Sequence, residues 1–144
     1  MNYKEMIAKL INKSFPKLKN KKIKVWDFKI FGGYAIFIPI LNLICINRKC
    51  NSFSNKEKIG ILVHELCHAE RSNEIELFKN MFIFIAYWLS PKFKKKEEEE
   101  TDKLAIKKGY AKELLESSKR FESEFGKKRY GLSSEQIKSY MKKD

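Results

Sequence analysis

The chain has 144 residues, and 31 lysine and arginine residues against 18 aspartate and glutamate residues give it a net charge of +13. Hydrophobic residues make up 43% of the chain, with six glycines and three prolines, which excludes disordered, collagen-like and low-complexity proteins. Length and composition predict one globular domain. The excess of lysine indicates an anionic partner without identifying it.

The N-terminal part is expected to contain one helix and three short strands. Residues 3–15 place apolar side chains at helical spacing, with lysines on the other faces. From Lys22 the pattern changes to alternation, and it predicts strands near residues 22–25, 34–38 and 41–46. A Gly32-Gly33 turn lies between the first two strands.

Three further helices are indicated downstream. Ser54 followed by Glu57 is a capping box, and it predicts a helix whose apolar stripe continues to residue 68. Residues 74–89 are helical in length and apolar on nearly every side, so we expect burial, with another subunit or a lipid surface as the alternatives. Ser90-Pro91 predicts the start of a helix that ends before Gly109.

The cysteines and the apolar segments bear on location. Cys45, Cys50 and Cys67 cannot all pair within one chain, and the N-terminus lacks the pattern of a signal peptide. The most apolar run, residues 81–89, is nine residues long, whereas a spanning helix needs about 20. We expect a reducing, cytoplasmic environment and no transmembrane segment.

The strongest chemical signal is His64-Glu65-Leu66-Cys67-His68, which lies within the helix that follows Ser54. Two imidazoles four residues apart project from one face of a helix, where they can bind zinc with the glutamate beside them as general base. The chain has two histidines, and both belong to this motif. The alternative is a structural role, in which two partly buried histidines form ordinary hydrogen bonds.

A catalytic zinc site has three protein ligands and an open fourth position. Because no further histidine exists, the third ligand must be a cysteine or a carboxylate. Cys45 and Cys50 stay as alternatives, although both fit small buried strand residues. Cys67 fits a small packing residue of the motif helix.

An acidic run, residues 97–100, lies in the helix after Ser90 and offers four carboxylates. At about 100° per residue, the apolar residues 104–106 average to a direction close to Glu98, and Asp102 lies one turn later on the same flank. The other three glutamates point further away and fit a solvated charge run with Lys-Glu pairs. Helix geometry therefore favours Glu98.

The motif at residues 64–68, followed by Glu98-Glu99-Glu100-Thr101-Asp102, resembles the gluzincin zinc metallopeptidases, which have HExxH and then ExxxD on a second helix. The resemblance covers roughly residues 23–109, and the short chain is most similar to the minimal-scaffold members, the minigluzincins. It implies the following roles: His64, His68 and Glu98 as Zn²⁺ ligands, Glu65 as the general base, and Asp102 as the carboxylate that orients a ligand histidine.

The resemblance has two further implications. The edge strand before the motif helix, within residues 41–47, should bind an extended substrate by strand addition. Thermolysin-like members use a histidine and a tyrosine for the oxyanion, and this chain has no spare histidine. The metal or a tyrosine must then stabilise the oxyanion, and Tyr110 and Tyr130 are the candidate tyrosines.

We therefore expect an α+β domain in which a small three- to four-stranded sheet packs on an active-site helix and a glutamate helix. Its expected function is a zinc-dependent endopeptidase acting on peptides or unfolded proteins, with Glu65 taking the proton of a metal-activated water. The alternative is a basic nucleic-acid- or lipid-binding protein with a structural or vestigial HExxH site. The lysines are dispersed and there are only four arginines, which argues against a nucleic-acid-binding function. An amidase or deaminase that uses the same zinc remains a further alternative.

Residues 1–110 form the expected catalytic domain, and residues 111–144 an expected C-terminal helical segment without chemistry of its own. Two helical patterns are divided near Gly126 and Gly131, and the last opens with a capping box from Ser133. We expect this segment to cover the cleft of its own or a partner's domain and keep the enzyme a latent zymogen. Exchange of the last helix would give a homodimer.

Overall fold

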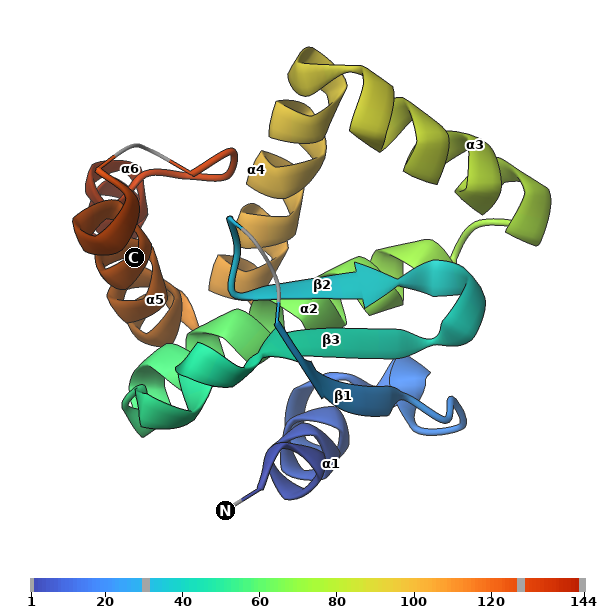
Figure 1. Cartoon of the computed structure of the whole chain (residues 1–144), viewed down its shortest axis with the longest axis horizontal. Coiled ribbons are helices and arrows are strands. Elements are labelled where there is room, and N and C mark those ends of the chain that lie inside the picture. The colour runs from blue at the N-terminus through green and yellow to red at the C-terminus, as the bar shows by residue number, and fades with distance from the viewer. Residues whose placement is uncertain (1, 30–31, 127–128, 143–144) are drawn as a thin grey trace.

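The computed structural model describes residues 2–29, 32–126 and 129–142. Within these ranges the chain is an α+β structure with six α-helices and one small mixed sheet (Figure 1). The expected α+β class and the small sheet beside helices are confirmed. Short 3-10 turns η1 (Pro16–Leu18), η2 (Pro39–Leu41) and η3 (Arg48–Ser52) connect the elements of the N-terminal part.

The sheet contains β1 (Lys24–Phe28), β2 (Ala35–Ile38) and β3 (Leu43–Asn47) in the order β1-β3-β2. β3 runs parallel to β1 and antiparallel to β2, and each of its residues is buried. The expectation that residues 41–47 form the edge strand is wrong, because neighbours on both sides use the backbone groups of β3. The edge strand that contacts α2 is β2.

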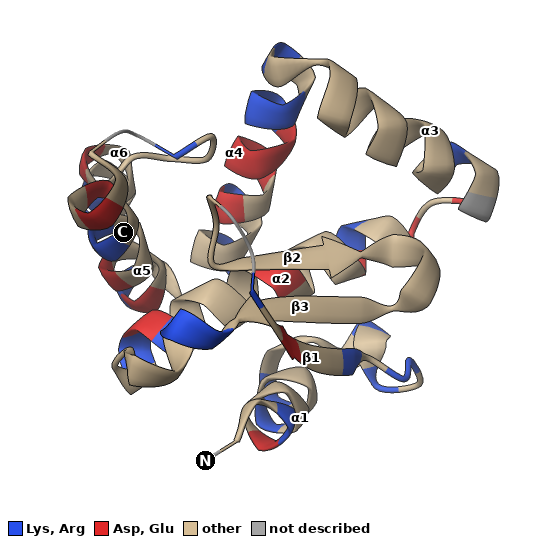
Figure 2. Cartoon of the chain, viewed as in Figure 1, with Lys and Arg blue, Asp and Glu red and all other residues tan. Residues whose placement is uncertain are grey.

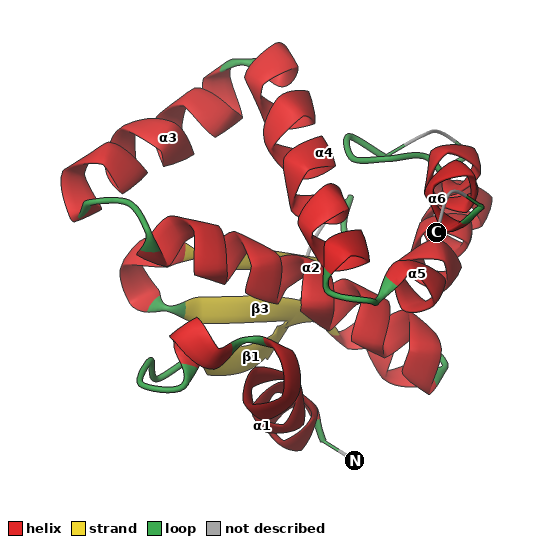
Figure 3. Cartoon of the chain, turned by 180° about the vertical axis from the view of Figure 1, so that it is seen from behind, coloured by secondary structure: helices red, strands yellow, loops and turns green. Residues whose placement is uncertain are grey.

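Helix α2 (Asn55–Asn73) is the central element of the fold. Ser54 and Glu57 form the expected capping box at its start. Together with α1 (Tyr3–Ser14), it lies on one face of the sheet (Figure 3). It also contacts α4 (Pro91–Lys107), whose N-cap Ser90 accepts a hydrogen bond from the Phe93 backbone N–H.

The C-terminal helices α5 (Ala111–Phe125) and α6 (Ser134–Met141) complete the same core. Leu114 and Ile137 are fully buried in the hydrophobic cluster that also contains residues of α1, α2 and β3. Helix α5 crosses α2 at Gly60, where a Cβ atom would lie 2.2 Å from the carbonyl oxygen of Glu113. Only a residue without a side chain permits this approach.

Helix α3 (Leu77–Leu89) is the element that differs most from expectation. The expected burial of this segment is wrong, since Phe78 is 74% exposed, Phe82 70% and Leu89 78%. The helix contacts α4 and η2 along one side, and its other side is in solvent. In the part of the chain that the structure describes, no helix has the length and apolar character needed to cross a membrane.

Candidate metal centre

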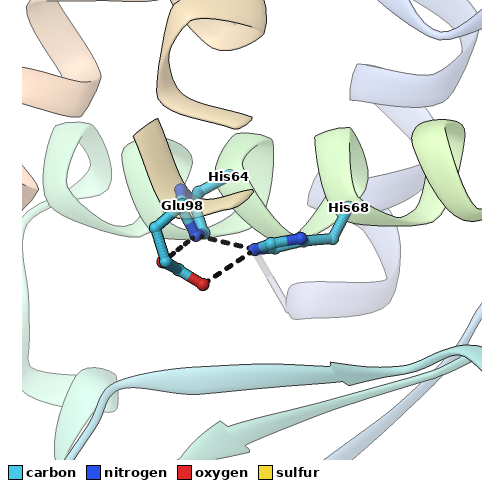
Figure 4. Close-up of side chains that lie close together, drawn as sticks. All are labelled: His64, His68 and Glu98. Carbon is cyan, nitrogen blue, oxygen red and sulfur yellow. Dashed lines mark hydrogen bonds and ion pairs between the residues drawn. The ribbon is translucent and has the colours of Figure 1, made fainter. Parts of the chain in front are cut away.

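Three side chains from two helices converge on one point. His64 and His68, one turn apart on α2, direct their Nε2 atoms toward the carboxylate of Glu98 on α4 (Figure 4). His64 Nε2 lies 3.1 Å from Glu98 Oε2, and His68 Nε2 lies 3.2 Å from Glu98 Oε1. The two Nε2 atoms are 3.1 Å apart.

This arrangement fits a zinc ion. Two ligand atoms bound at about 2.0–2.2 Å to a tetrahedral zinc lie roughly 3.3 Å from each other, close to the separations observed. Two imidazoles and one glutamate are also a donor set typical of catalytic zinc, with a fourth position open. Within the described residues, His64, His68 and Glu98 are the group of histidine, cysteine and acidic side chains that could hold a metal ion.

The outer nitrogen of each imidazole faces an oxygen of α4. His64 Nδ1 donates to Asp102 Oδ1 at 2.7 Å, and Thr101 Oγ1 lies 3.4 Å from His68 Nδ1. A proton held at Nδ1 leaves the Nε2 lone pair directed inward, which is the tautomer a metal ligand requires. The resemblance implied that Asp102 orients a ligand histidine, and the structure brings Asp102 to His64; the contact of Thr101 with His68 was missed.

Residues beyond α5 also reach this cluster. Arg129 Nη2 donates to Asp102 Oδ1 at 2.7 Å and lies 3.2 Å from His64 Nδ1. The backbone N–H of Leu132 donates to Asp102 Oδ2 at 2.8 Å. Between them, Gly131 has no room for a side chain, since a Cβ would lie 2.1 Å from Asp102 Oδ2. The expectation that residues 111–144 contribute nothing to the chemistry of the site is therefore wrong.

Glu65 lies beside the candidate metal ligands and faces the sheet. Its side chain is buried, and the backbone N–H of Phe37 in β2 donates to its carboxylate. Burial raises the pKa of Glu65, and the nearby imidazoles of the two histidines oppose the rise. A carboxylate with a raised pKa can both accept and return a proton near neutral pH, as a general base must.

Charge within the cluster is balanced by its own members. Burial alone would lower the pKa of His64, but the carboxylates of Glu98 and Asp102 outweigh burial and raise it to about 10. Burial would raise the pKa of Glu98, but the two imidazoles hold it well below its usual value. Arg129 and His64 likewise lower the pKa of buried Asp102. The metal-free site therefore pairs protonated imidazole with ionised carboxylates.

A cavity of about 550 Å³ opens beside the cluster, lined by His64, Glu65, His68 and Glu98. Part of its remaining wall is apolar and comes from α3 and β2, including Ile36, Ile83 and Phe84. The site is thus accessible from a space that can hold a small segment of a ligand.

The two tyrosines considered for the oxyanion have different positions. Tyr130 lines the cavity, beneath Lys94, whose Nζ lies 4.5 Å from the ring centroid. Tyr110 is wrong for this role, because it is buried away from the cavity with its hydroxyl 2.7 Å from Ser14 Oγ. The tyrosine closest to the cluster is Tyr87 of α3, whose hydroxyl donates to Glu98 Oε1; burial and the Glu98 charge raise its pKa.

The remaining glutamates of the acidic run have other partners. Glu97 pairs with Arg71 at 2.8 Å, and Glu99 and Glu100 pair with lysines on their own helix at 3.9 and 2.7 Å. All three cysteines are free and buried. None of them belongs to the group of described residues that could hold a metal ion.

Sequence reasoning missed Tyr87 and Arg129, and each left a weak signal. Tyr87 is the one residue with a hydroxyl in the apolar run 81–89, and a helix that turns this face inward needs a partner for it. Arg129 is one of four arginines in a chain of 27 lysines. Its planar guanidinium suits a buried carboxylate better than an ammonium group does.

No protein-family model matches the chain, and the comparisons with curated proteins and with solved structures found no match either.

Proposed function

We propose that this chain is a zinc-dependent endopeptidase of the gluzincin type. The observation that carries the proposal is the convergence of His64, His68 and Glu98 on one point, with buried Glu65 beside it. A zinc ion bound there would act as a Lewis acid and lower the pKa of a bound water. A purely structural role of the two histidines would not require that Glu98 contact both of them at the wall of a cavity.

Each residue of the site has a distinct proposed role. Glu65 accepts the proton of the attacking water and donates it to the leaving amine. Asp102 holds His64 through Nδ1, and Arg129 keeps Asp102 ionised. Tyr87, hydrogen-bonded to Glu98, orients that carboxylate when no substrate is present.

A peptide substrate is supported by the position of β2. Among the described strands β2 pairs with β3 alone, and three of its residues line the cavity. An extended peptide could add to this edge and lie between β2 and the metal centre. The substrate-binding strand is therefore proposed to be β2, in place of the segment 41–47 expected from the sequence.

Metal analysis of two matched variants tests the ligand set. Purified wild type should contain about one zinc per chain, Glu98→Ala should lose it, and Glu99→Ala, one residue away on the same helix, should keep it. Zinc retained at the wild-type level in Glu98→Ala would show that Glu98 is no ligand.

A third variant tests the reaction. Glu65→Gln should keep its zinc and lose hydrolysis of an unfolded protein by about 100-fold or more, because an amide cannot take the water's proton. Glu99→Gln serves as its control and should cleave as wild type does. Full activity of Glu65→Gln would overturn the mechanism.

Latency of the full chain stays a prediction. Tyr130 lines the cavity, and the backbone N–H of nearby Leu132 donates to Asp102, so residues 130–132, which precede α6, lie at the site. Helix α6 packs on α5 of the same chain, which supports cover from within one chain more than helix exchange between two.

A further inference from the structure

We propose that the outer face of α3 docks on the surface of an anionic lipid bilayer. This face is defined by Phe78, Met81, Phe82, Ile85 and Leu89, which occupy positions i, i+3, i+4, i+7 and i+11 of the helix. All five side chains are exposed, by 41–78%. The proposal goes beyond the hydrolytic function and does not depend on it.

The direction of this face is fixed by polar contacts on the opposite side of the helix. The Asn80 side-chain amide donates to the carbonyls of Ser72 at 2.7 Å and Ile75 at 3.2 Å. Near the other end, the Tyr87 hydroxyl donates to Glu98. With both anchors on the cavity side, the helix cannot turn its outer face inward without breaking them.

Apolar residues continue beyond the five. Trp88, at the C-terminal end of α3, is 57% exposed. The turn η2 contacts α3 and leaves Ile40 and Leu41 about half exposed. Such a gathering of exposed large apolar side chains marks an interaction surface rather than ordinary scatter.

Positive charge lies beyond the C-terminal end of the helix. At the N-terminal end, exposed Lys79 pairs with exposed Glu76 at 3.5 Å, so the two charges cancel. After the helix ends, three lysines are exposed in the first turns of α4: Lys92, Lys95 and Lys96. Figure 2 shows lysine and arginine, in blue, beside the corner between α3 and α4. Apolar and aromatic side chains beside a group of lysines are the composition of helices that lie in the interface of an anionic membrane.

A second copy of the chain is the weaker occupant. A helix of 13 residues is about 20 Å long and about 10 Å wide, so one face offers a footprint on the order of 200 Å². Stable protein interfaces bury roughly 800 Å² on each partner. A polyanion such as nucleic acid would match the lysines, but it has no apolar surface for five exposed hydrophobic side chains.

Binding to lipid vesicles tests the proposal, with one exposed aromatic residue substituted on α3 and another substituted on β1 as its control. The protein is mixed with vesicles of equal parts phosphatidylglycerol and phosphatidylcholine, or of phosphatidylcholine alone, and binding is measured by flotation. We expect binding to the anionic vesicles that Phe82→Glu weakens about tenfold or more, with Trp26→Glu on β1, 61% exposed in wild type, as the control that leaves binding unchanged. Absence of binding to anionic vesicles, or equal loss in both variants, would overturn the proposal.

The contribution of the lysines at the start of α4 is tested against that of lysines on α1. The double variant Lys92→Gln/Lys96→Gln should weaken binding and reduce its dependence on salt, whereas Lys4→Gln/Lys13→Gln on α1 should do so less. Equal effects would mean that net charge alone drives binding, which overturns the role of this face. Glu65→Gln should bind vesicles as wild type does, so failure of the hydrolytic function and failure of docking are distinguishable.

The chain's two tryptophans report which surface enters the lipid. Trp26→Phe leaves Trp88 as the reporter, and Trp88→Phe leaves Trp26. With brominated acyl chains in the vesicles, we expect quenching of Trp88 fluorescence and little quenching of Trp26 fluorescence. The reverse pattern would overturn the proposal, as would light scattering that shows a dimer abolished by Phe82→Glu without vesicle binding.

Discussion

Asp102 shows how strongly one buried carboxylate can be fixed by its surroundings. Its two oxygens accept hydrogen bonds from the imidazole of His64, the guanidinium of Arg129 and the backbone of Leu132. Three donors compensate for complete burial and hold the pKa of Asp102 below its usual value, against the effect of desolvation. The result is a rigid negative charge directly behind a proposed metal ligand.

Asp102→Asn tests this support. The amide cannot accept from all three donors, so we expect the affinity for zinc to fall by about 10- to 100-fold with the three ligands intact. Competition with a fluorescent chelator measures the change. Asp27→Asn, at an exposed position of β1, is the control, and an unaltered affinity in Asp102→Asn would remove Asp102 from the metal centre.

The protonation of His64 predicts a pH dependence of metal binding. In the metal-free protein the pKa of His64 is raised to about 10, because Glu98 and Asp102 outweigh the effect of burial. A metal must displace this proton, so apparent affinity should rise with pH, by about tenfold per unit below that pKa. Calorimetry in buffers of different ionisation enthalpy should count about one proton released; affinity independent of pH would contradict the protonated state.

At the scale of elements, the crossing of α2 and α5 places the motif helix. Gly60 lies four residues before His64 and permits contact with the backbone of Glu113. Helix propensity alone predicts that Gly60→Ala raises stability by about 1 kcal/mol. Packing predicts the opposite sign, since the new Cβ would lie 2.2 Å from a carbonyl oxygen.

We therefore expect Gly60→Ala to destabilise the protein by about 1–3 kcal/mol. In a chain of this length the melting temperature should fall by roughly 2–12 °C, measured by circular dichroism. If Gly60→Ala lowers the melting temperature but keeps the zinc content of the wild type, the substitution displaces α5 and leaves the metal ligands in place. A raised melting temperature would contradict the close packing of the two helices.

Local signals in the sequence predicted where helices begin and which glutamate of α4 faces the candidate site. The capping boxes at Ser54 and Ser133 need only residues three positions apart, and both form. Glu98 could be selected from four glutamates because the apolar residues of the same helix fix which side packs. Such inferences need no knowledge of distant contacts.

Features that depend on distant contacts could not be predicted. The central position of β3 is set by its pairing with β1, although β2 lies between these two strands in the sequence, and the apolar run of β3 does not reveal which strands are its neighbours. The exposure of α3 contradicts its composition, because Asn80 and Tyr87 anchor the opposite face. Arg129 reaches His64 across 65 positions of sequence, a distance over which no helix or strand period extends.

At the scale of the whole molecule, the proposed metal centre connects parts that are far apart in the chain. Its residues come from α2, α4 and the loop before α6. Removal of the metal should therefore lower the stability of the entire domain rather than loosen one loop. For zinc present at 100 times its dissociation constant, the loss is about 2.7 kcal/mol.

Melting curves with and without a chelator measure this coupling. A loss of that size corresponds to a fall of roughly 5–11 °C for a chain of this length, and added zinc should restore the original value. Glu98→Ala should melt at one temperature under both conditions. Equal melting temperatures of the wild-type protein with and without the chelator would contradict a metal that couples these elements.

The hydrogen bond from Leu132 to Asp102 also sets an order of events during synthesis. When Asp102 has been added, His64, His68 and Glu98 already exist, but the backbone donor of Asp102 follows 30 positions later. At about 5–20 residues per second, a ribosome needs about 1.5–6 s to add them. A growing chain thus carries all three proposed metal ligands for seconds before it carries their support, and a metal captured in that interval would be held less tightly than in the finished protein.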